Sequence, residues 1–159
     1  GEKIVYPKDT SELNYEAELA IVIGKRCKNL ERSECSEVLV GYTCTNDLTA
    51  RDLQRRDGQW TRAKSYDTFA PLGPFIQPFE GVPELGVRCR VNGKTVQDGS
   101  TKNMIFDVCT LVEFVSRVMT LESGDVIMTG TPAGVGMLER GDVVEVEIDG
   151  LPALKNEVV

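Results

Sequence analysis

The sequence predicts an α+β domain that is rich in β-strands. Several short segments alternate apolar and polar residues with a period of two, which is typical of half-buried strands. The dipeptide Asn92-Gly93 separates two segments of β-forming residues and is a strong signal for a β-hairpin. Residues 107–120, by contrast, repeat apolar side chains at helical spacing. At 159 residues the chain is long enough to bury a core of its own, so we expect a single domain over residues 1–159.

The composition excludes several classes of function. A net charge of -7 and a pI near 4.7 disfavour binding to nucleic acid or to an anionic membrane, because phosphate groups require clustered Lys and Arg. No apolar run approaches the roughly 18 residues of a membrane span, and the polar N-terminus is unlike a signal peptide. We therefore expect a soluble, cytoplasmic protein without nucleic-acid or membrane partners.

The chain contains no histidine, which limits the chemistry that it can perform. Ser-His and Cys-His catalysis and His-ligated metals are excluded within this chain. Acid–base work therefore falls to Glu, Asp, Lys, Tyr, Cys or a metal-bound water.

The cysteines favour reduced thiols over a disulfide framework or a zinc site. Their number is odd and none of them forms a C-x-x-C pair. They are Cys27, Cys35, Cys44, Cys89 and Cys109.

Residues 15–24 form the strand around which we interpret the remaining sequence. Alternation places Glu16 and Glu18 on one face, with Cα atoms about 6.5–7 Å apart, among small and apolar neighbours. Two carboxylates at the edge of a core repel each other and lose hydration. The usual remedies are a raised pKa of one carboxyl group or a nearby cation, and a hard divalent metal such as Mg²⁺ takes oxygen ligands of this kind. Taken alone, the pair is more typical of solvent-facing glutamates on an edge strand, and the segments that follow favour the cation site.

The next segments bring further polar groups toward this strand. Residues 33–39 are predicted to form a short helix with Ser33 as its N-cap, and residues 40–47 a strand that ends on the carboxylate of Asp47. The chain before residue 15 lacks a cap or pattern of its own, and we expect a further segment before Gly1 in the natural protein.

A helix is predicted over residues 50–56 from the S/T-x-x-D pattern at its start. Arg51 and Gln54 are three residues apart and share one face of this helix. A guanidinium at this position could bind a substrate carboxylate through two parallel hydrogen bonds. Alternatively, Arg51 is solvated or paired with Asp47 or Asp52.

Four more segments complete the predicted architecture. Residues 70–76 form a strand interrupted by prolines, and residues 87–96 form the hairpin, to which we assign no role beyond architecture. Residues 126–129 and 142–148 form further strands. The helix over residues 107–120, with Asp107 as N-cap, is expected to turn its apolar side chains toward the core: Leu111, Phe114, Val115, Val118 and Met119.

Residues 130–136 form a glycine-rich loop directly after a strand. A P-loop is excluded because the Gly-Lys-Ser/Thr ending is missing and no helical pattern follows. The backbone N–H groups and the Thr131 hydroxyl could still bind an anion such as a carboxylate. A purely structural turn explains the composition equally well.

Taken together, these segments resemble the fumarylacetoacetate hydrolase family over nearly the whole chain and in the family's order. The resemblance rests on Tyr15 to Leu19, Val22 to Gly24, Gly41-Tyr42, Asn46-Asp47, Ala50 to Gln54, Ala63 to Ser65, Leu121 to Asp125 and Thr129 to Gly136. It implies a β-rich α+β fold of layered, rolled sheets with a few short helices.

The resemblance also implies a divalent metal, usually Mg²⁺ and in some members Mn²⁺ or Ca²⁺. By motif, the metal ligands would be Glu16, Glu18 and Asp47. The groups that hold the substrate and stabilise an enolate would be Arg51, Gln54 and Lys64. The loop would contact the substrate carboxylate through Gly130 and Thr131.

The implied activity is that of an enzyme on small 2-oxo or 2-enol acids, by C–C bond hydrolysis, decarboxylation or keto-enol isomerisation. Many family members carry a His/Glu pair upstream of the position of Gly1, and without such a pair the protein would be a catalytically silent metal- and carboxylate-binding member. The resemblance further implies a homodimer. We expect its contact in a proline-rich apolar segment that contains Tyr66, Phe69, Pro71, Leu72, Pro74 and Phe75.

Overall fold

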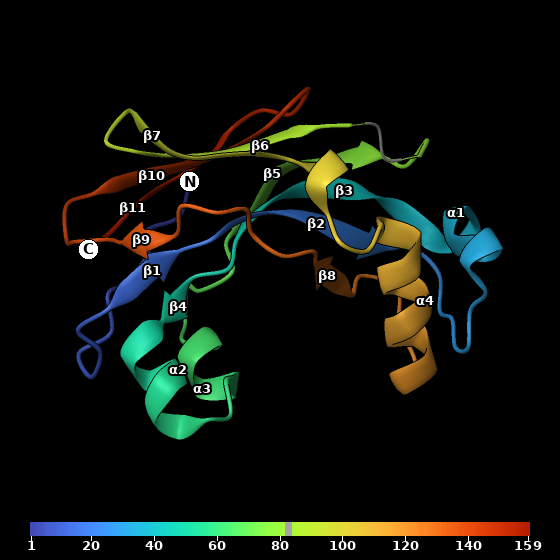
Figure 1. Ribbon diagram of the computed structural model, residues 1–159, viewed down its shortest axis with the longest axis horizontal. Helices are drawn as coiled ribbons and strands as arrows, with labels where there is room; N and C mark the ends of the chain where they lie inside the picture. Colours follow the sequence, from blue (N-terminus) through green and yellow to red (C-terminus); the bar gives the residue numbers. More distant parts are fainter. Residues whose placement is uncertain (82–83) are drawn as a thin grey trace.

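The computed structural model describes residues 1–81 and 84–159. Its central sheet is antiparallel and has the strand order β5-β3-β2-β8 (Figure 1). These strands are Leu72–Pro78 (β5), Leu39–Asn46 (β3), Ala17–Ile23 (β2) and Val126–Met128 (β8). The proline-interrupted β5 lies at the edge of the sheet, where a residue without an N–H group is tolerated.

A second antiparallel sheet, in the order β11-β10-β6-β7, packs against the central one. Its strands are Leu154–Glu157 (β11), Val143–Ile148 (β10), Gly86–Val91 (β6) and Lys94–Ser100 (β7). The hairpin of β6 and β7 turns at Asn92-Gly93, both with positive φ, as the sequence predicts. A small third sheet, β4-β1-β9, consists of Thr49–Ala50, Leu13–Tyr15 and Gly136–Met137.

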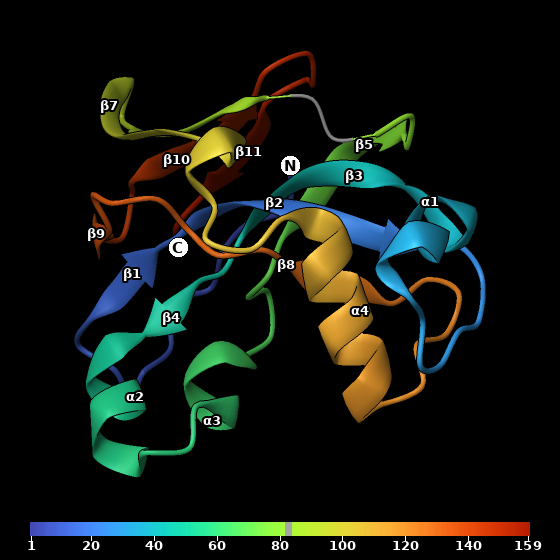
Figure 2. The ribbon, with the colours of Figure 1, turned by 45° about the vertical axis from the view of Figure 1, so that its right-hand side comes forward.

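The helices are short and lie beside the sheets (Figure 2). They are Cys35–Val38 (α1), Arg51–Asp57 (α2), Thr61–Lys64 (α3) and Val108–Val118 (α4), with 3₁₀ turns at Arg32–Glu34 (η1) and Thr101–Asn103 (η2). The short helix predicted over residues 33–39 is divided between η1 and α1, and Glu31 replaces Ser33 as its N-cap. The prediction of a β-rich α+β fold is confirmed. No helix in the described ranges is long and apolar enough to cross a membrane.

The core lies between the two larger sheets. All seven residues of β2 are buried: the strand lies between β3 and β8 in the central sheet, and β6 and β10 of the second sheet contact it. The acidic strand is therefore interior, and an edge position for it is wrong. Its carboxylates lie in the protein and not at a solvated margin.

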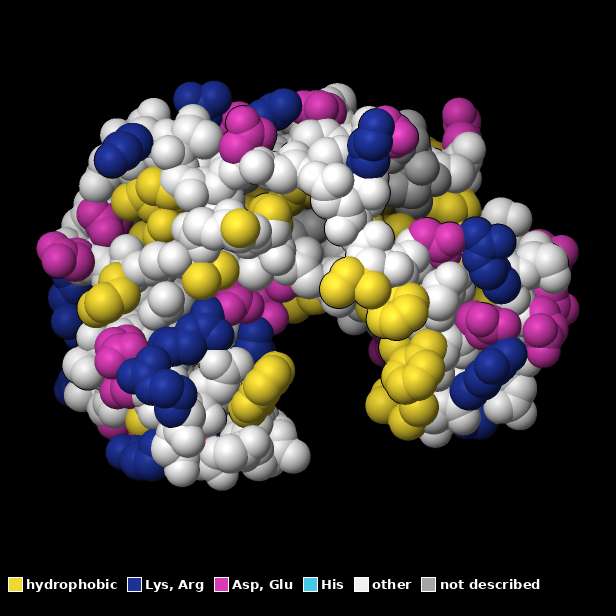
Figure 3. Space-filling model, in the orientation of Figure 1, with side chains coloured by type: hydrophobic (Ala, Val, Ile, Leu, Met, Phe, Trp, Pro, Cys, Tyr) yellow, Lys and Arg dark blue, Asp and Glu magenta, His cyan; other side chains and the backbone are white. Residues whose placement is uncertain are grey.

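The prediction that the apolar side chains of α4 face the core is wrong for most of them. Asp107 caps the helix as predicted, with its carboxylate accepting from the Thr110 N–H at 2.8 Å. However, Phe114 is 66% exposed, and the buried positions are Val108, Val112 and Ser116. The Ser116 hydroxyl accepts from the Leu30 N–H and so attaches this side of the helix to the chain before η1. Exposed hydrophobic side chains consequently gather on the side of α4 that borders the hollow between this helix and α2 and α3 (Figure 3).

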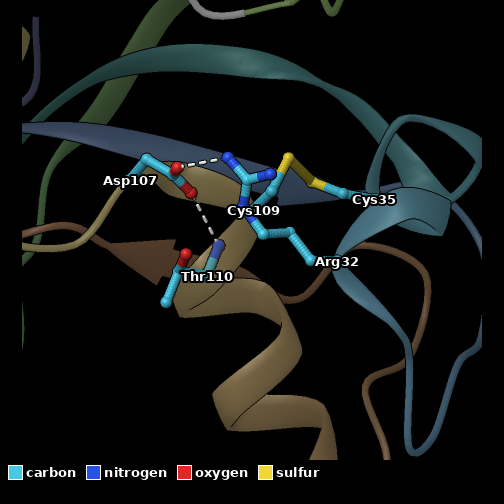
Figure 4. The surroundings of a disulfide bond; sticks show 5 residues. All are labelled: Arg32, Cys35, Asp107, Cys109 and Thr110. Carbon is cyan, nitrogen blue, oxygen red and sulfur yellow. Dashed lines mark hydrogen bonds and ion pairs between the residues drawn. A yellow bond between two sulfur atoms is a disulfide. The ribbon is translucent and has the colours of Figure 1, made fainter.

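The prediction that all cysteines are free thiols is wrong for one pair. Cys35 in α1 and Cys109 in α4 form a disulfide, with Cα atoms 5.4 Å apart and 74 positions apart in sequence (Figure 4). Spacing could not reveal this pair, because two distant helices bring it together. The Arg32 guanidinium binds the Asp107 carboxylate at 2.6 Å beside it and joins the same two regions. The remaining three cysteines are free and buried.

The apolar segment proposed for a dimer contact is divided by the fold. Phe69 is only 9% exposed and packs against Tyr66, with ring centroids 5.4 Å apart. Packing within the chain therefore accounts for these two rings. Leu72 and Phe75 on the edge strand β5 are exposed.

Candidate metal centre

Strand register brings three carboxylates together at one end of the central sheet. Glu16 precedes β2, Glu18 lies within it, and Asp47 follows β3. The antiparallel pairing of β2 with β3 places Asp47 opposite Glu16, and the Asp47 N–H donates to the Glu16 carbonyl at 2.8 Å. Residues 31 positions apart in sequence thus become neighbours because the two strands pair.

The three carboxylates form one compact cluster. Each offers an oxygen, and these oxygens lie within 4.8 Å of one another. Glu18 is 3% exposed, Glu16 is also buried and Asp47 is partly buried. Three carboxylates at this separation, two of them buried, repel one another when charged, and nearby cations stabilise them. An all-oxygen set of this kind fits a hard divalent cation such as Mg²⁺, Mn²⁺ or Ca²⁺.

Two basic side chains approach the cluster from the helices that follow β4. Arg51 at the start of α2 donates to Glu16, and also to Gln54 Oε1 at 2.7 Å. The predicted shared face of Arg51 and Gln54 is therefore confirmed. Lys64 at the end of α3 donates to Asp47 and lies 3.0 Å from Glu16 Oε2. The structure thus brings all six predicted metal-ligand and catalytic residues to one place.

The structure shows a different partner for Arg51 from the two carboxylates that the sequence suggests as alternatives. Arg51 pairs with Glu16 and not with Asp47 or Asp52. Asp52 instead accepts from the Thr10 hydroxyl and the Ser11 N–H. These hydrogen bonds keep the pKa of Asp52 low although burial opposes them.

Burial and mutual repulsion perturb the protonation of the cluster. Burial raises the pKa of Glu18 to about 7, and the charges of Asp47 and Glu16 add to this effect, while the Gly130 N–H and Lys64 oppose it. Burial also raises the pKa of Asp47, against the opposing effect of Lys64. Burial acts against the charge of Lys64, but its hydrogen bonds to Asp47 and Glu16 outweigh that effect and raise its pKa. Lys64 is therefore protonated at neutral pH.

The glycine-rich loop after β8 forms one side of the cluster. The Gly130 N–H donates to Glu18 Oε2 at 2.7 Å, with Gly130 at φ +97°. The Thr131 hydroxyl donates to the Ala17 carbonyl at 2.8 Å and thereby attaches the loop to the start of β2. Its single proton is used in this bond. The contact of Gly130 and Thr131 with a substrate carboxylate stays a prediction.

The same loop forms one wall of a cavity of about 560 Å³. Thr129 to Ala133 line it together with residues of β7, η2 and the segment before α4. Its lining is apolar or neutral except for Asp98, among the residues that the structure describes, and the three clustered carboxylates do not line it. The cavity is therefore adjacent to the cluster but distinct from it.

Two residues that support the site were not singled out from the sequence. Asn46 is fully buried, and its Oδ1 accepts from the Glu16 N–H at 2.8 Å. Its place beside Asp47 in a family motif was the only available signal. Gln97 reaches the site from β7, in the hairpin to which only an architectural role was assigned. No local pattern marks it, because its contacts depend on the packing of two sheets.

The fold and the site together define a β-rich domain with a buried triad of carboxylates, flanked by an arginine and a lysine. The sequence-family model described as fumarylacetoacetate (FAA) hydrolase C-terminal matches residues 1–159 of the chain. The chain belongs to the fumarylacetoacetate hydrolase family.

Similar proteins include one of known sequence and two of known structure. A protein of Archaeoglobus fulgidus is 58% identical over 98% of this chain. The structure of 2-hydroxyhepta-2,4-diene-1,7-dioate isomerase from Mycobacterium marinum is 48% identical over 100% of the chain, with a TM-score of 0.97. Fumarylpyruvate hydrolase from Pseudomonas aeruginosa, in complex with Mn²⁺ and pyruvate, is 35% identical over 99% of the chain, with a TM-score of 0.92. The chain spans 62%, 63% and 70% of these proteins, respectively.

Proposed function

We propose that this domain binds a divalent cation through Glu16, Glu18 and Asp47 and acts on small 2-oxo or 2-enol acids. The observation that carries the proposal is the buried carboxylate triad with two basic side chains directed at it. The Pseudomonas relative, whose structure contains Mn²⁺ and pyruvate, supports both the metal and the class of ligand. Mg²⁺ is our first expectation for the metal, with Mn²⁺ or Ca²⁺ as alternatives.

When bound, the cation would act as a Lewis acid toward the carboxylate and keto oxygens of a 2-oxo acid. Arg51 presents a guanidinium held by Gln54, and this fixed geometry suits bidentate binding of a carboxylate. Lys64 holds its proton on Nζ and is suited to stabilise negative charge on an enolate oxygen. It can donate a proton but is poorly suited to act as a general base.

The reaction we expect is C–C bond hydrolysis, decarboxylation or keto-enol isomerisation. Hydrolysis and isomerisation are the activities named for the Pseudomonas and Mycobacterium relatives. All three reactions place negative charge on the same oxygen, and the site is arranged to stabilise that charge. The choice among them depends on the proton donors and acceptors around the substrate.

The proposal is tested with the full-length protein. Acylpyruvates, oxaloacetate and 2-hydroxy-diene-dioates are assayed with Mg²⁺ or Mn²⁺ and after exhaustive chelation. We expect turnover of at least one substrate, lost on chelation and restored by metal. Turnover that is unaffected by chelation contradicts the metal mechanism.

A second candidate is a catalytically silent member that binds metal and a carboxylate ligand. It is favoured by the lack of histidine in the chain, which leaves proton transfer in the cluster to its carboxyl groups and to Lys64. Binding of pyruvate in the presence of Mn²⁺ without turnover of any of these substrates would support it. The homodimer and the cytoplasmic location stay predictions.

A further inference from the structure

Gln97 is a buried amide that connects the two large sheets next to the carboxylate cluster. It is 1% exposed and lies on β7, outside the sheet that carries the cluster. Its Oε1 accepts from the Ala17 N–H at 3.0 Å. Its Nε2 donates to Thr131 Oγ1 at 2.8 Å and to the Pro132 carbonyl at 2.9 Å. Both donor hydrogens of the amide are therefore used.

These three hydrogen bonds fix two segments that determine the position of the Glu18 carboxylate: the strand that carries it and the loop that donates to it. Ala17 lies between Glu16 and Glu18 in the strand, so one bond fixes the backbone that carries the carboxylates. The other two fix the loop whose Gly130 N–H binds Glu18. Thr131 closes the arrangement, because its hydroxyl donates to the Ala17 carbonyl. A shift of the loop would displace the hydrogen-bond donor that supports the Glu18 carboxylate.

Close packing of the loop on β7 is an independent observation. A Cβ atom on Gly134 would lie 2.4 Å from the Val96 carbonyl, and one on Gly99 would lie 2.5 Å from Pro132 Cβ. Both glycines thus permit an approach that no other residue allows. The loop is seated directly on the strand that carries Gln97, so β7 determines where the loop lies.

We propose that Gln97 is a positioning residue of the metal centre. It sets the positions of Gly130 and Glu18 relative to each other, and so it determines how well the three carboxylates bind a cation. The inference rests on the proposed function, because it assumes that the cluster binds metal. Residues that orient metal ligands typically contribute about 10- to 100-fold in metal affinity.

The test compares two buried amides with different neighbours. Gln97→Met keeps the length of the side chain and removes all three hydrogen bonds. The control is Asn156→Leu, which removes a buried amide that donates to the Glu2 carbonyl at 2.7 Å, away from the cluster. Mn²⁺ affinity is measured by titration of the metal-free full-length proteins, and Tm is measured in parallel.

We expect Gln97→Met to weaken Mn²⁺ binding about tenfold or more. Asn156→Leu should lower Tm and leave the affinity within about twofold of the natural protein. Unchanged affinity in Gln97→Met, or equal weakening in both variants, overturns the positioning role. If the natural protein does not bind Mn²⁺, the proposed function fails first and this inference fails with it.

A second pair of variants applies if Gln97→Met does not fold. Thr131→Val removes the hydroxyl that links Gln97 to the Ala17 carbonyl, whereas Thr131→Ser retains it. We expect Thr131→Val to weaken Mn²⁺ binding and Thr131→Ser to bind as the natural protein does. Equal affinities in the two variants overturn the inference.

Discussion

The ammonium group of Lys64 lies 3.0 Å from Glu16 Oε2 and also donates to Asp47, so a single cation serves two of the three clustered carboxylates. Helix α3 carries Lys64 to this position, while Glu16 and Asp47 come from the ends of paired strands. The carboxylates are thus neutralised in part by the same side chain that we propose as the stabiliser of an enolate. In the proposed function, the binding of the cation and the stabilisation of the enolate would both involve this lysine.

Replacing Lys64 separates these two roles. In Lys64→Met the buried carboxylates lose a compensating charge, so the metal-free protein should be less stable than the natural one. Mn²⁺ should then raise Tm by more than it does in the natural protein. Turnover should fall by about two orders of magnitude or more, because a charged stabiliser of the transition state is removed.

The measurements are thermal unfolding with and without Mn²⁺ and steady-state kinetics. Lys155→Met is the matched control, since Lys155 pairs with Glu145 at the surface and is mostly exposed. Lys155→Met should change neither the Tm, with or without Mn²⁺, nor the turnover. Undiminished turnover in Lys64→Met would remove this residue from the catalytic assignment.

Glu18→Gln tests the ligand assignment with little change in shape. The amide oxygen can still accept from the Gly130 N–H, but the anionic charge is gone. We expect Mg²⁺ and Mn²⁺ binding to be lost or severely weakened, because Mg²⁺ dehydrates reluctantly and needs its charged ligands. The fold should survive, since one member of a repelling group has been neutralised. Calorimetric titration with unchanged affinity would exclude Glu18 as a ligand, and Glu157→Gln at the surface is the control.

The pH dependence of metal binding follows from the pKa of Glu18, which burial raises to about 7. Because the folded-state pKa is above that of the unfolded chain, this carboxyl favours the folded state at low pH, and that contribution is lost as the pH rises through about 7. A metal ion must displace the same proton. Mn²⁺ affinity should therefore rise with pH, by at most about tenfold per unit for this group, and level off above about 7.

Titrations across this range check the prediction, with Tm of the metal-free protein recorded at each pH. In Glu18→Gln the part of the Tm change that arises from this carboxyl should disappear. An Mn²⁺ affinity that is independent of pH between about 5 and 8 would contradict the raised pKa.

Local patterns in the sequence predicted the parts of the fold that local patterns determine. The Asn92-Gly93 hairpin, the cap at Asp107 and the shared face of Arg51 and Gln54 depend on neighbours in the chain, and all three are observed. Alternation also placed Glu16 and Glu18 on one face. The groups that surround them could not be predicted in this way, because they come from α2, α3 and the loop after β8, which only the fold brings to this strand.

The other features that the sequence does not predict also depend on contacts between segments far apart in the chain. The disulfide joins residues 74 positions apart, and the amide of Gln97 acts across two sheets. The helical spacing of α4 predicts an apolar face but not what covers that face. Phe114 belongs to that face and lies at the surface.

The Cys35–Cys109 disulfide should stabilise the attachment of α1 to α4. Closing a loop of this length is worth about 4 kcal/mol in the chain-entropy model. Cys109→Ser, or reduction of the natural protein, should therefore lower Tm, while reducing agent should have no effect on the variant. Thiol titration of the denatured 159-residue chain gives the number of free cysteines, and five free thiols before reduction would show that the bond is absent.

A homodimer contact through β5 predicts different effects for two phenylalanines in the same segment. Phe69 packs inside its own chain, so Phe69→Asp should unfold the protein by placing an unpaired charge in the core. Phe75 is 56% exposed on the edge strand, so Phe75→Asp should leave the fold intact and favour monomers if β5 forms the contact. Phe114→Asp on the exposed face of α4 is the matched control, with the same change at another exposed apolar position.

Light scattering of the full-length proteins at micromolar concentration gives the mass, and circular dichroism gives the folded state. We expect a dimer for the natural protein and for Phe114→Asp, and a folded monomer for Phe75→Asp. A stable contact should bury above roughly 1,000 Å² in total, which Phe75 with Leu72 and Ile76 alone cannot provide, so further residues along β5 must take part. A monomeric natural protein contradicts the assembly. If Phe114→Asp is the variant that dissociates, the contact lies on α4, and the assignment of the interface to β5 is wrong.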